Sequence, residues 1–370
     1  MNNDLLIFIG TLPWVLFLII ILMVCSAKGN QSQRLRALFV FVFFFAAIRY
    51  GIGYDYFSYK YIIEGNGQDY QLERWEILPR FLAVISGKVH YQLFFAISSF
   101  LTIYPVYYVS KKLSIDPLKS FFVYLMFPLF FLDGLGVMRN AVAYSFVFLM
   151  FYQLYRRKYI YSVAFWLLAI GFHTSAVVAV LIYPLFYFFY NRSLNLVLYI
   201  ASFIISASII PLIESLSPNN ALLIKFLDNV DKDITSFGGI FFYIINGIAI
   251  YHLFFWKKLS ILHPQNKIYL TMINMGICLW NIFLPIDPTT AQRLSLFYLL
   301  FLVLLIPSYK LISIPNRKVI SFAVNTFLIL LFISSLSLNL YGYYEKGRNM
   351  SNIPYQVFFL DPSDALMHIN

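Results

Sequence analysis

The sequence predicts an all-α integral membrane protein that crosses the bilayer about twelve times, and three observations support this class. Of its 370 residues, 61% are hydrophobic and only 12% are charged, which is about half the charged share of a soluble domain. The apolar residues form long runs, and the basic residues cluster in alternate connectors between these runs. We expect a single membrane domain over residues 1–370.

The apolar runs are the first element of this prediction, because helices of about 20 residues cross the hydrocarbon core. An acid precedes the first run and basic residues follow it, the reverse of a cleaved signal peptide, so we expect a retained helix there. Polar outer segments lie at about residues 55–90, 214–237 and 342–370. We expect spans at residues 5–25, 37–54, 91–109, 117–132, 137–155, 159–172, 174–190, 194–213, 238–256, 267–285, 292–309 and 319–341.

The connectors set the orientation. Those on one side carry 16 of the 27 basic residues and a single acid, Asp116. By the positive-inside rule this side is cytoplasmic, and both termini are outside. The net charge of +11 therefore reflects topology, and we expect no nucleic-acid partner.

Residues 133–175 read as one helical hairpin around which the chain is organised. An apolar run at 137–155 leads to the basic turn Arg156–Lys158, and a second run at 159–172 returns. Arg139 and His173 then lie at nearly the same depth, at the end opposite the basic turn. A cation at that depth is costly, which suggests a functional role.

The outer segment at 55–90 follows a span that ends in Arg49 and a glycine-containing turn before Asp55. Within it, apolar residues at 77, 78, 81, 82 and 85 repeat at helical spacing. The pattern predicts either an amphipathic helix on the outer surface or a short re-entrant element. The sequence leaves both open.

Five polar side chains gather at the outer ends of the predicted spans: Arg49, Asp55, Arg139, His173 and Arg293. A guanidinium offers a planar fork for phosphate oxygens, so three arginines at one depth suggest an anionic ligand. The aspartate and the histidine are able to accept a proton.

Each of these residues also has a plain structural alternative. These are snorkelling for Arg49, a pair with Asp133 for Arg139, a pair with Asp287 for Arg293, capping of a helix junction for His173 and a turn position for Asp55.

Other residue patterns indicate packing. Four asparagines are expected to form hydrogen bonds between helices: Asn140, Asn246, Asn274 and Asn281. The sequence contains no HExxH motif, phosphate-binding loop, GxSxG motif or Cys/His cluster. We therefore expect no metal and no cofactor.

Three segments resemble the EpsG-type family of bacterial polysaccharide polymerases, which is similar to O-antigen polymerases of the Wzy kind. They are RYGIGYDYFSY (49–59), MRNAVAYSFVFLMFYQLYRRK (138–158) and LLAIGFHTSAVVAVLIYPL (167–185). Within them, Arg49, the Gly-x-Asp-Tyr-x-x-Tyr of residues 53–59, Arg139 and the Phe-His of 172–173 match the pattern. A late arginine and a Pro-Tyr pair in the tail correspond to Arg293 and Pro354–Tyr355.

The resemblance implies a metal-independent glycosyltransferase of the bacterial inner membrane with its active site facing outside, and it is compatible with a GT-C-like architecture. Such enzymes join undecaprenyl-diphosphate-linked oligosaccharide repeat units of O-antigen, capsule or exopolysaccharide. The implied partners are this lipid-linked oligosaccharide, the lipid bilayer, a flippase and a chain-length regulator.

The resemblance also implies a role for each candidate residue. Arg139 and Arg293, with Arg49 third, would bind diphosphate, and Asp55 would be the base or the acceptor-sugar ligand, with His173 second. The rings of Tyr54, Tyr56 and Tyr59 would stack on sugars, although tyrosines also form aromatic belts at the membrane interface.

Two other functions compete with this reading. A flippase or transporter of the same lipid-linked sugars predicts internal pseudo-symmetry and a cationic cavity near the midplane, but the charges gather at one face and the halves do not echo each other. An acyltransferase built on His173 would need that residue deep in the membrane or inside, whereas the predicted topology places it outside.

Overall fold

The computed structural model describes residues 3–65, 72–188, 190–216, 238–311, 317–346 and 352–360. Over these ranges the chain is almost entirely helical, and its one sheet is a two-stranded ribbon. The all-α class is confirmed. The chain groups into two compact units, residues 1–174 with 318–370 and residues 175–317, which are described separately. The expectation of a single domain stays a prediction.

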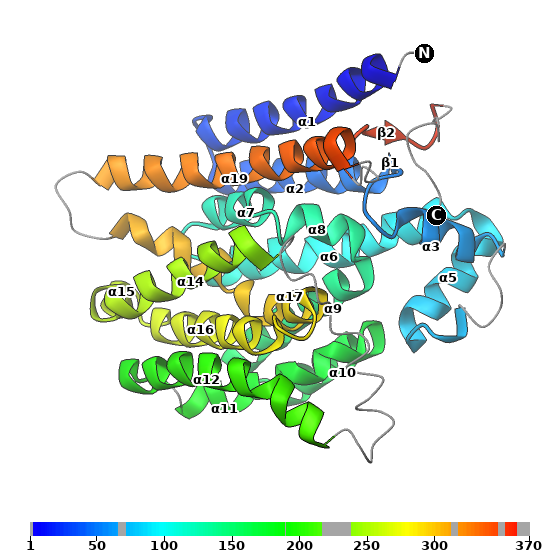
Figure 1. The fold of residues 1–370 in the computed structure, drawn as a ribbon. Coiled ribbons are helices and arrows are strands. Elements are labelled where there is room, and N and C mark those ends of the chain that lie inside the picture. Colours follow the sequence, from blue (N-terminus) through cyan, green and yellow to red (C-terminus); the bar gives the residue numbers. More distant parts are fainter. Residues whose placement is uncertain are drawn as a thin grey trace. The chain divides into compact units, whose positions relative to one another are not determined.

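The first unit contains the N-terminal helices, the predicted hairpin and the returning C-terminal helix (Figure 1). Its helices are α1 (Asn3–Ser26), α2 (Gln31–Ala47), α3 (Tyr56–Ile63), α5 (Ile77–Val89), α6 (Gln92–Leu113), α7 (Pro117–Met126), α8 (Phe131–Gly136), α9 (Met138–Tyr155), α10 (Tyr159–Phe172) and α19 (Arg317–Lys346). Its strands are β1 (Arg49–Tyr50) and β2 (Gln356–Val357).

The second unit follows directly from the hairpin. Its elements are η1 (Thr174–Leu181), α11 (Ile182–Phe188), α12 (Arg192–Leu216), α14 (Gly238–Phe254), α15 (Trp256–Leu262), α16 (Asn266–Phe283), α17 (Pro288–Leu299), α18 (Leu302–Leu305) and η3 (Ile306–Leu311). The acidic part of the predicted outer segment at 214–237, with Asp228, Asp231 and Asp233, lies outside the described residues.

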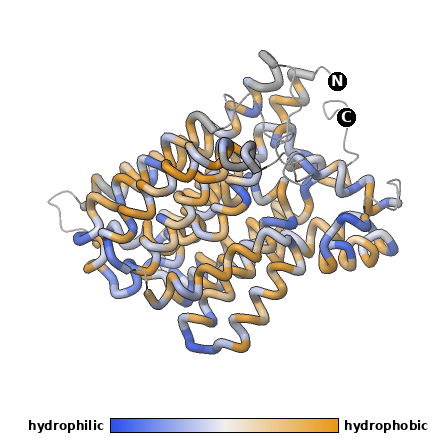
Figure 2. The backbone as a smooth tube through the Cα atoms, turned by 60° about the horizontal axis from the view of Figure 1, so that its bottom comes forward, coloured by the Kyte–Doolittle hydropathy of each residue, from blue (hydrophilic) through white to orange (hydrophobic). Residues whose placement is uncertain are grey.

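Long apolar helices make this a multi-pass membrane protein. Over the described ranges, five helices are long and apolar enough to cross a bilayer: 7–26, 92–113, 192–211, 288–311 and 321–341. A sixth is the pair 240–254 and 256–262, which is bent by 79°. Figure 2 shows hydrophobic residues along the long helices and hydrophilic residues mainly at their ends.

The expected twelve spans exceed this number because several predicted runs do not form one long helix. The run at 117–132 becomes α7 and the start of α8, with a break between them, and the run at 174–190 becomes the 3₁₀ segment η1 followed by α11. Helix α10 has only 14 residues. The number of twelve and the outside position of the termini stay predictions.

The predicted hairpin is confirmed as α9 and α10, joined at Arg156–Lys158. Nearly all side chains of α9 are buried, and the helix packs against both α10 and α6. The Ser162 hydroxyl donates to the Met150 carbonyl at 3.0 Å, and the Ser145 hydroxyl donates to the Thr102 carbonyl at 2.9 Å. A buried α9 gives the residues at its first turn a rigid base.

The predicted amphipathic helix is confirmed as α5. It contacts α3, α6 and α10 and buries Leu82 on that side, while Ile77 and Phe81 are 78% and 66% exposed. An exposed apolar face is expected of a helix that contacts lipid. Whether α5 lies on the surface or enters the bilayer stays a prediction.

The prediction that asparagines join helices is confirmed for three residues of the second unit. Asn246 of α14 and Asn281 of α16 exchange two amide hydrogen bonds of 3.0 and 3.1 Å. Asn274 of α16 donates to the Asn195 carbonyl of α12 at 3.0 Å. Asn140 is buried in α9.

The segment 352–360 returns the end of the chain to α1 and α2. Strand β2 pairs antiparallel with β1, with Arg49 opposite Val357. The Tyr355 amide donates to the Gly10 carbonyl at 2.9 Å, and the Trp14 indole donates to the Asn352 carbonyl at 2.6 Å. Because β1 runs directly into the turn before α3, this ribbon fixes the start of that turn.

Candidate functional site

The turn at residues 51–55 lies against the junction of α8 and α9. Gly51 and Gly53 have φ values of 68° and 108°, a region that favours glycine. A Cβ on Gly53 would lie 2.4 Å from the Leu135 carbonyl oxygen, and one on Gly136 would lie 3.0 Å from the Tyr54 nitrogen. The two backbones therefore touch because both positions lack side chains. This contact places the turn beside the start of α9, three residues before Arg139.

Arg49 lies fully buried beneath this turn. Its five N–H groups all have acceptors, which come from α2, the turn itself, α6 and the α8–α9 junction. The acceptors are the carbonyls of Ala46, Ile52 (3.3 Å) and Leu135 (3.1 Å), the Ser99 hydroxyl (2.9 Å) and the Met138 sulfur (3.2 Å). The guanidinium thus ties four parts of the unit together and has every donor occupied.

Arg139 differs from Arg49 in that its side chain is partly open to solvent, with 25% of its surface exposed. Its Nη1 lies 2.8 Å from Oε2 of Glu76 at the start of α5, and its guanidinium lies 5.3 Å from the centre of the Trp75 ring. It also forms a hydrogen bond with the Tyr59 side chain. This arginine is therefore oriented by an anion and by aromatic rings, yet remains accessible.

Glu76 is the central acceptor of this region. While Oε2 binds Arg139, Oε1 accepts from the Thr174 amide at 3.1 Å and lies 3.5 Å from the Thr174 hydroxyl. One carboxylate therefore connects the start of α5, the start of α9 and the end of the hairpin. Sequence reasoning missed Glu76, because its partners lie 63 and 98 positions away and no local motif marks it.

Asp55 occupies the position before α3 and is half-buried. Its carbonyl accepts from the Tyr59 amide at 2.9 Å, so Asp55 and Tyr59 lie one helical turn apart on the same face of α3. Tyr59 in turn contacts Arg139. The structure therefore brings the Asp55 turn and Arg139 into the same region of the first unit.

The three candidate sugar-binding tyrosines lie in different environments. Tyr54 is 60% exposed, whereas Tyr56 and Tyr59 are 0% and 3% exposed. The ring of Tyr56 stacks on Phe95 at 4.1 Å, and that of Tyr59 lies edge-on to Trp75 at 5.1 Å. Tyr54 is thus the one of the three whose side chain is largely exposed.

His173 ends α10, and its amide donates to the Ala169 carbonyl at 2.9 Å. Its side chain is half-buried. The residue that follows it is the one that binds Glu76, so the imidazole lies at the junction held by that carboxylate. The predicted match in depth between His173 and Arg139 is consistent with the contacts of Glu76, which joins Arg139 to Thr174, the residue next to His173.

Arg293 belongs to the second unit, where it is half-buried on α17. Asp287, at the start of the same helix, caps it: its side chain accepts hydrogen bonds from the amides of Thr289 and Thr290, at 3.0 and 2.8 Å. Burial alone would raise the pKa of Asp287, but the Thr290 hydroxyl, these amides and the nearby Arg293 charge outweigh it and lower the pKa. The electrostatic link of Asp287 and Arg293 agrees with the structural alternative for this arginine. A common site with Arg139 stays a prediction.

Among the described residues, no group of three or more His, Cys, Asp or Glu side chains is placed to hold a metal ion.

Comparison with known proteins identifies the family. The EpsG family model matches residues 34–357, a range that contains the turn, Glu76, Arg139 and the ribbon. Neither the curated proteins nor the solved structures gave a match.

Proposed function

From its membership of the EpsG family, a family of Wzy-like polysaccharide polymerases, we propose a reaction for this chain. It joins undecaprenyl-diphosphate-linked oligosaccharide repeat units. The product is an O-antigen, capsule or exopolysaccharide chain, made on the outer face of the bacterial inner membrane. The enzyme works beside a flippase that delivers the units and a chain-length regulator.

The proposed reaction is a glycosyl transfer between two lipid-linked molecules. A hydroxyl of the sugar on one unit attacks the anomeric carbon of the growing chain. The bond from that carbon to the diphosphate of its carrier breaks, the hydroxyl proton passes to a base, and the lipid diphosphate leaves with the bonding electrons. Catalysis therefore needs cationic contact with the diphosphate and a proton acceptor near the hydroxyl.

The observation that carries the proposal is the accessible Arg139 beside the Asp55 turn. Arg139 binds the diphosphate, because its side chain is partly exposed and is oriented by Glu76 and Trp75. Asp55 accepts the proton or binds the acceptor sugar, and His173 is the second candidate for this role. Arg293 adds a further cation to the diphosphate.

The buried residues of the motif receive a supporting role in this proposal. The five donors of Arg49 are occupied, so Arg49 holds the turn and does not contact the diphosphate. Tyr56 and Tyr59 pack the turn against α6 and Trp75, and Tyr54 is the ring that stacks on a sugar.

The proposal is tested by a surface-polysaccharide gel from a strain that lacks the gene. Collapse of the long-chain ladder to a single repeat unit is the expected result. Loss of the single-unit band as well would mean that units no longer reach the outer face. This result would refute the polymerase function and favour the flippase hypothesis.

The site is tested in the same strain with plasmid-borne variants. Arg139→Ala and Asp55→Ala should abolish the ladder at an unchanged protein level in the membrane. Arg156→Ala is the matched control, because Arg156 follows the other end of the same helix, and it should restore a normal ladder. Normal ladders from the first two variants would refute the assignment of the site.

A further inference from the structure

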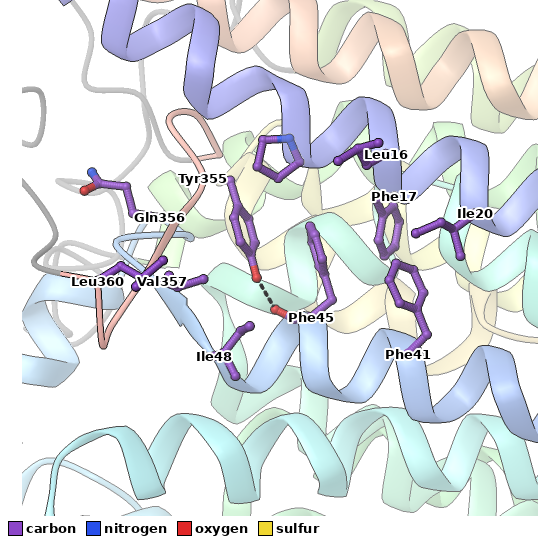
Figure 3. A pocket seen from close by; sticks show the side chains of 11 residues that line it. Leu16, Phe17, Ile20, Phe41, Phe45, Ile48, Tyr355, Gln356, Val357 and Leu360 are labelled. Carbon is purple, nitrogen blue, oxygen red and sulfur yellow. Dashed lines mark hydrogen bonds between the residues drawn. The ribbon is translucent and has the colours of Figure 1, made fainter.

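A cavity of about 480 Å³ lies between α1, α2 and the segment 352–360. Its size is in the range of small-molecule binding sites, and the side chains already assigned to the reaction do not line it. Figure 3 shows Leu16, Phe17 and Ile20 of α1 facing Phe41 and Phe45 of α2.

The walls of this cavity suit hydrocarbon and offer little to a polar group. Its one hydroxyl, on Tyr355, donates to the Phe45 carbonyl, and the Tyr355 ring stacks on Phe45 at 4.2 Å. Gln356 is the other polar side chain on the wall, and it belongs to the ribbon at the edge of the cavity. A ligand would therefore place a hydrocarbon chain here and keep its polar head outside.

The shape and depth of the cavity fit a chain that lies along the membrane helices. The lining residues run from Pro13 to Ile20 on α1 and from Phe41 to Ile48 on α2, about 10 Å along each helix axis. Helix α1 contains a candidate span with a mean hydropathy of 2.8, and Leu16 on the cavity wall is 58% exposed. A helix of this hydropathy would contact the bilayer, so its exposed wall would give lipid hydrocarbon access to the cavity.

One end of the cavity lies at the β1–β2 ribbon, which leads into the turn of the candidate site. Ile48 and Val357 line it, and Val357 pairs with Arg49 in the ribbon. The turn that carries Asp55 begins two residues after Arg49. A lipid whose diphosphate lies beside this turn would have the first part of its chain in the cavity.

We propose that the cavity binds the isoprenoid chain of the polyprenyl diphosphate carrier, in the part next to the diphosphate. This assignment rests on the proposed polymerase function and adds a site for the lipid to it.

The test uses the full chain in nanodiscs of phosphatidylethanolamine and phosphatidylglycerol. The probe is an undecaprenyl diphosphate analogue with a diazirine on an isoprene unit near the diphosphate, and labelled peptides are identified by mass spectrometry. A phosphatidylglycerol with a diazirine in its acyl chain serves as the second probe. We expect the isoprenoid probe to label peptides of α1 and α2, and unlabelled undecaprenyl phosphate to compete with it.

A matched pair of variants locates the label. Ile20→Trp fills the cavity, whereas Ile19→Trp makes the same change at the neighbouring position, which is 45% exposed and does not line the cavity. Ile20→Trp should lower labelling about tenfold, equivalent to about 1.4 kcal/mol of binding free energy, and Ile19→Trp should leave it unchanged. Leu16→Trp replaces Ile20→Trp if that variant does not reach the membrane.

Two results would overturn the inference. One is labelling of the same walls by the phosphatidylglycerol probe without competition from undecaprenyl phosphate, which would assign the cavity to membrane phospholipid. The other is no labelling of α1 and α2 in a protein that still produces a ladder. This result would refute isoprenoid binding in the cavity without refuting the polymerase function. Failure of the polymerase itself is read separately, from the gel of the deletion strain.

Discussion

Replacing Gly53 by alanine tests whether the turn before α3 must touch the α8–α9 junction. The new Cβ would lie 2.4 Å from the Leu135 carbonyl oxygen and 2.6 Å from the Gly136 Cα. Both are backbone atoms, so no side-chain rotation relieves the overlap. The turn must move by about 1 Å to restore ordinary contact, and a displacement of this size at an active site lowers the rate by about 100-fold. The left-handed backbone adds about 1–2 kcal/mol against alanine.

The assay is the polysaccharide ladder in the deletion strain, together with the amount and thermal stability of the protein in detergent. Gly29→Ala is the matched control, because Gly29 also has a positive φ, of 128°, but has no atom within 4 Å of its added Cβ. We expect Gly53→Ala to lose the long-chain ladder and Gly29→Ala to keep it. A wild-type ladder from Gly53→Ala, or equal loss in both variants, would refute the argument from close contact.

Three further predictions follow from the contacts of single residues. Glu76→Gln should lower polymerisation about tenfold at an unchanged protein level, because it removes a charge-assisted hydrogen bond to Arg139 worth about 1.5 kcal/mol or more; a normal rate would show that Arg139 is oriented without it. Arg49→Lys should lower both protein level and ladder, because an ammonium has three donors for five acceptors, and a normal level of the folded variant would contradict this. Asp287→Asn should lower the melting temperature near neutral pH. The pKa of Asp287 is lowered in the folded protein, so its carboxylate stabilises the fold at a pH above the ordinary pKa of about 4 and loses this effect as the pH falls through the folded pKa. The melting temperatures of the wild type and of Asp287→Asn should therefore converge in acid. A difference that stays constant with pH would contradict the stabilising role of the carboxylate.

The hairpin and its position were predictable because they depend on local information. The lengths of two apolar runs and the basic turn at Arg156–Lys158 are enough to fix α9 and α10, and the hairpin geometry then places Arg139 and His173 at one end. The helix α5 was predictable for the same reason, from the spacing of its apolar residues. The number of spans was less accessible, because breaks such as the one between α7 and α8 depend on how buried segments pack.

The partners of the site residues could not be read from the sequence. Glu76 binds Arg139 across 63 positions, and β1 pairs with β2 from the other end of the chain. Neither contact leaves a periodic pattern, because each depends on one residue in each segment. The burial of Arg49 and Tyr56 is also a result of packing, and a motif shows only that such residues occur together.

The contrast between Arg49 and Arg139 shows how the turn is held in place. Burying a guanidinium carries a large desolvation cost that must be offset by well-placed hydrogen bonds, and Arg49 meets this with acceptors from four parts of the first unit. The contact of Gly53 with Leu135 and the pairing of β1 with β2 constrain the same turn from other sides. If the proposed site lies at this turn, such support would keep its reacting groups in a fixed geometry. The two arginines should therefore separate in experiment: Arg49→Lys should disturb both folding and polymerisation, whereas Arg139→Ala should leave folding intact and remove polymerisation alone.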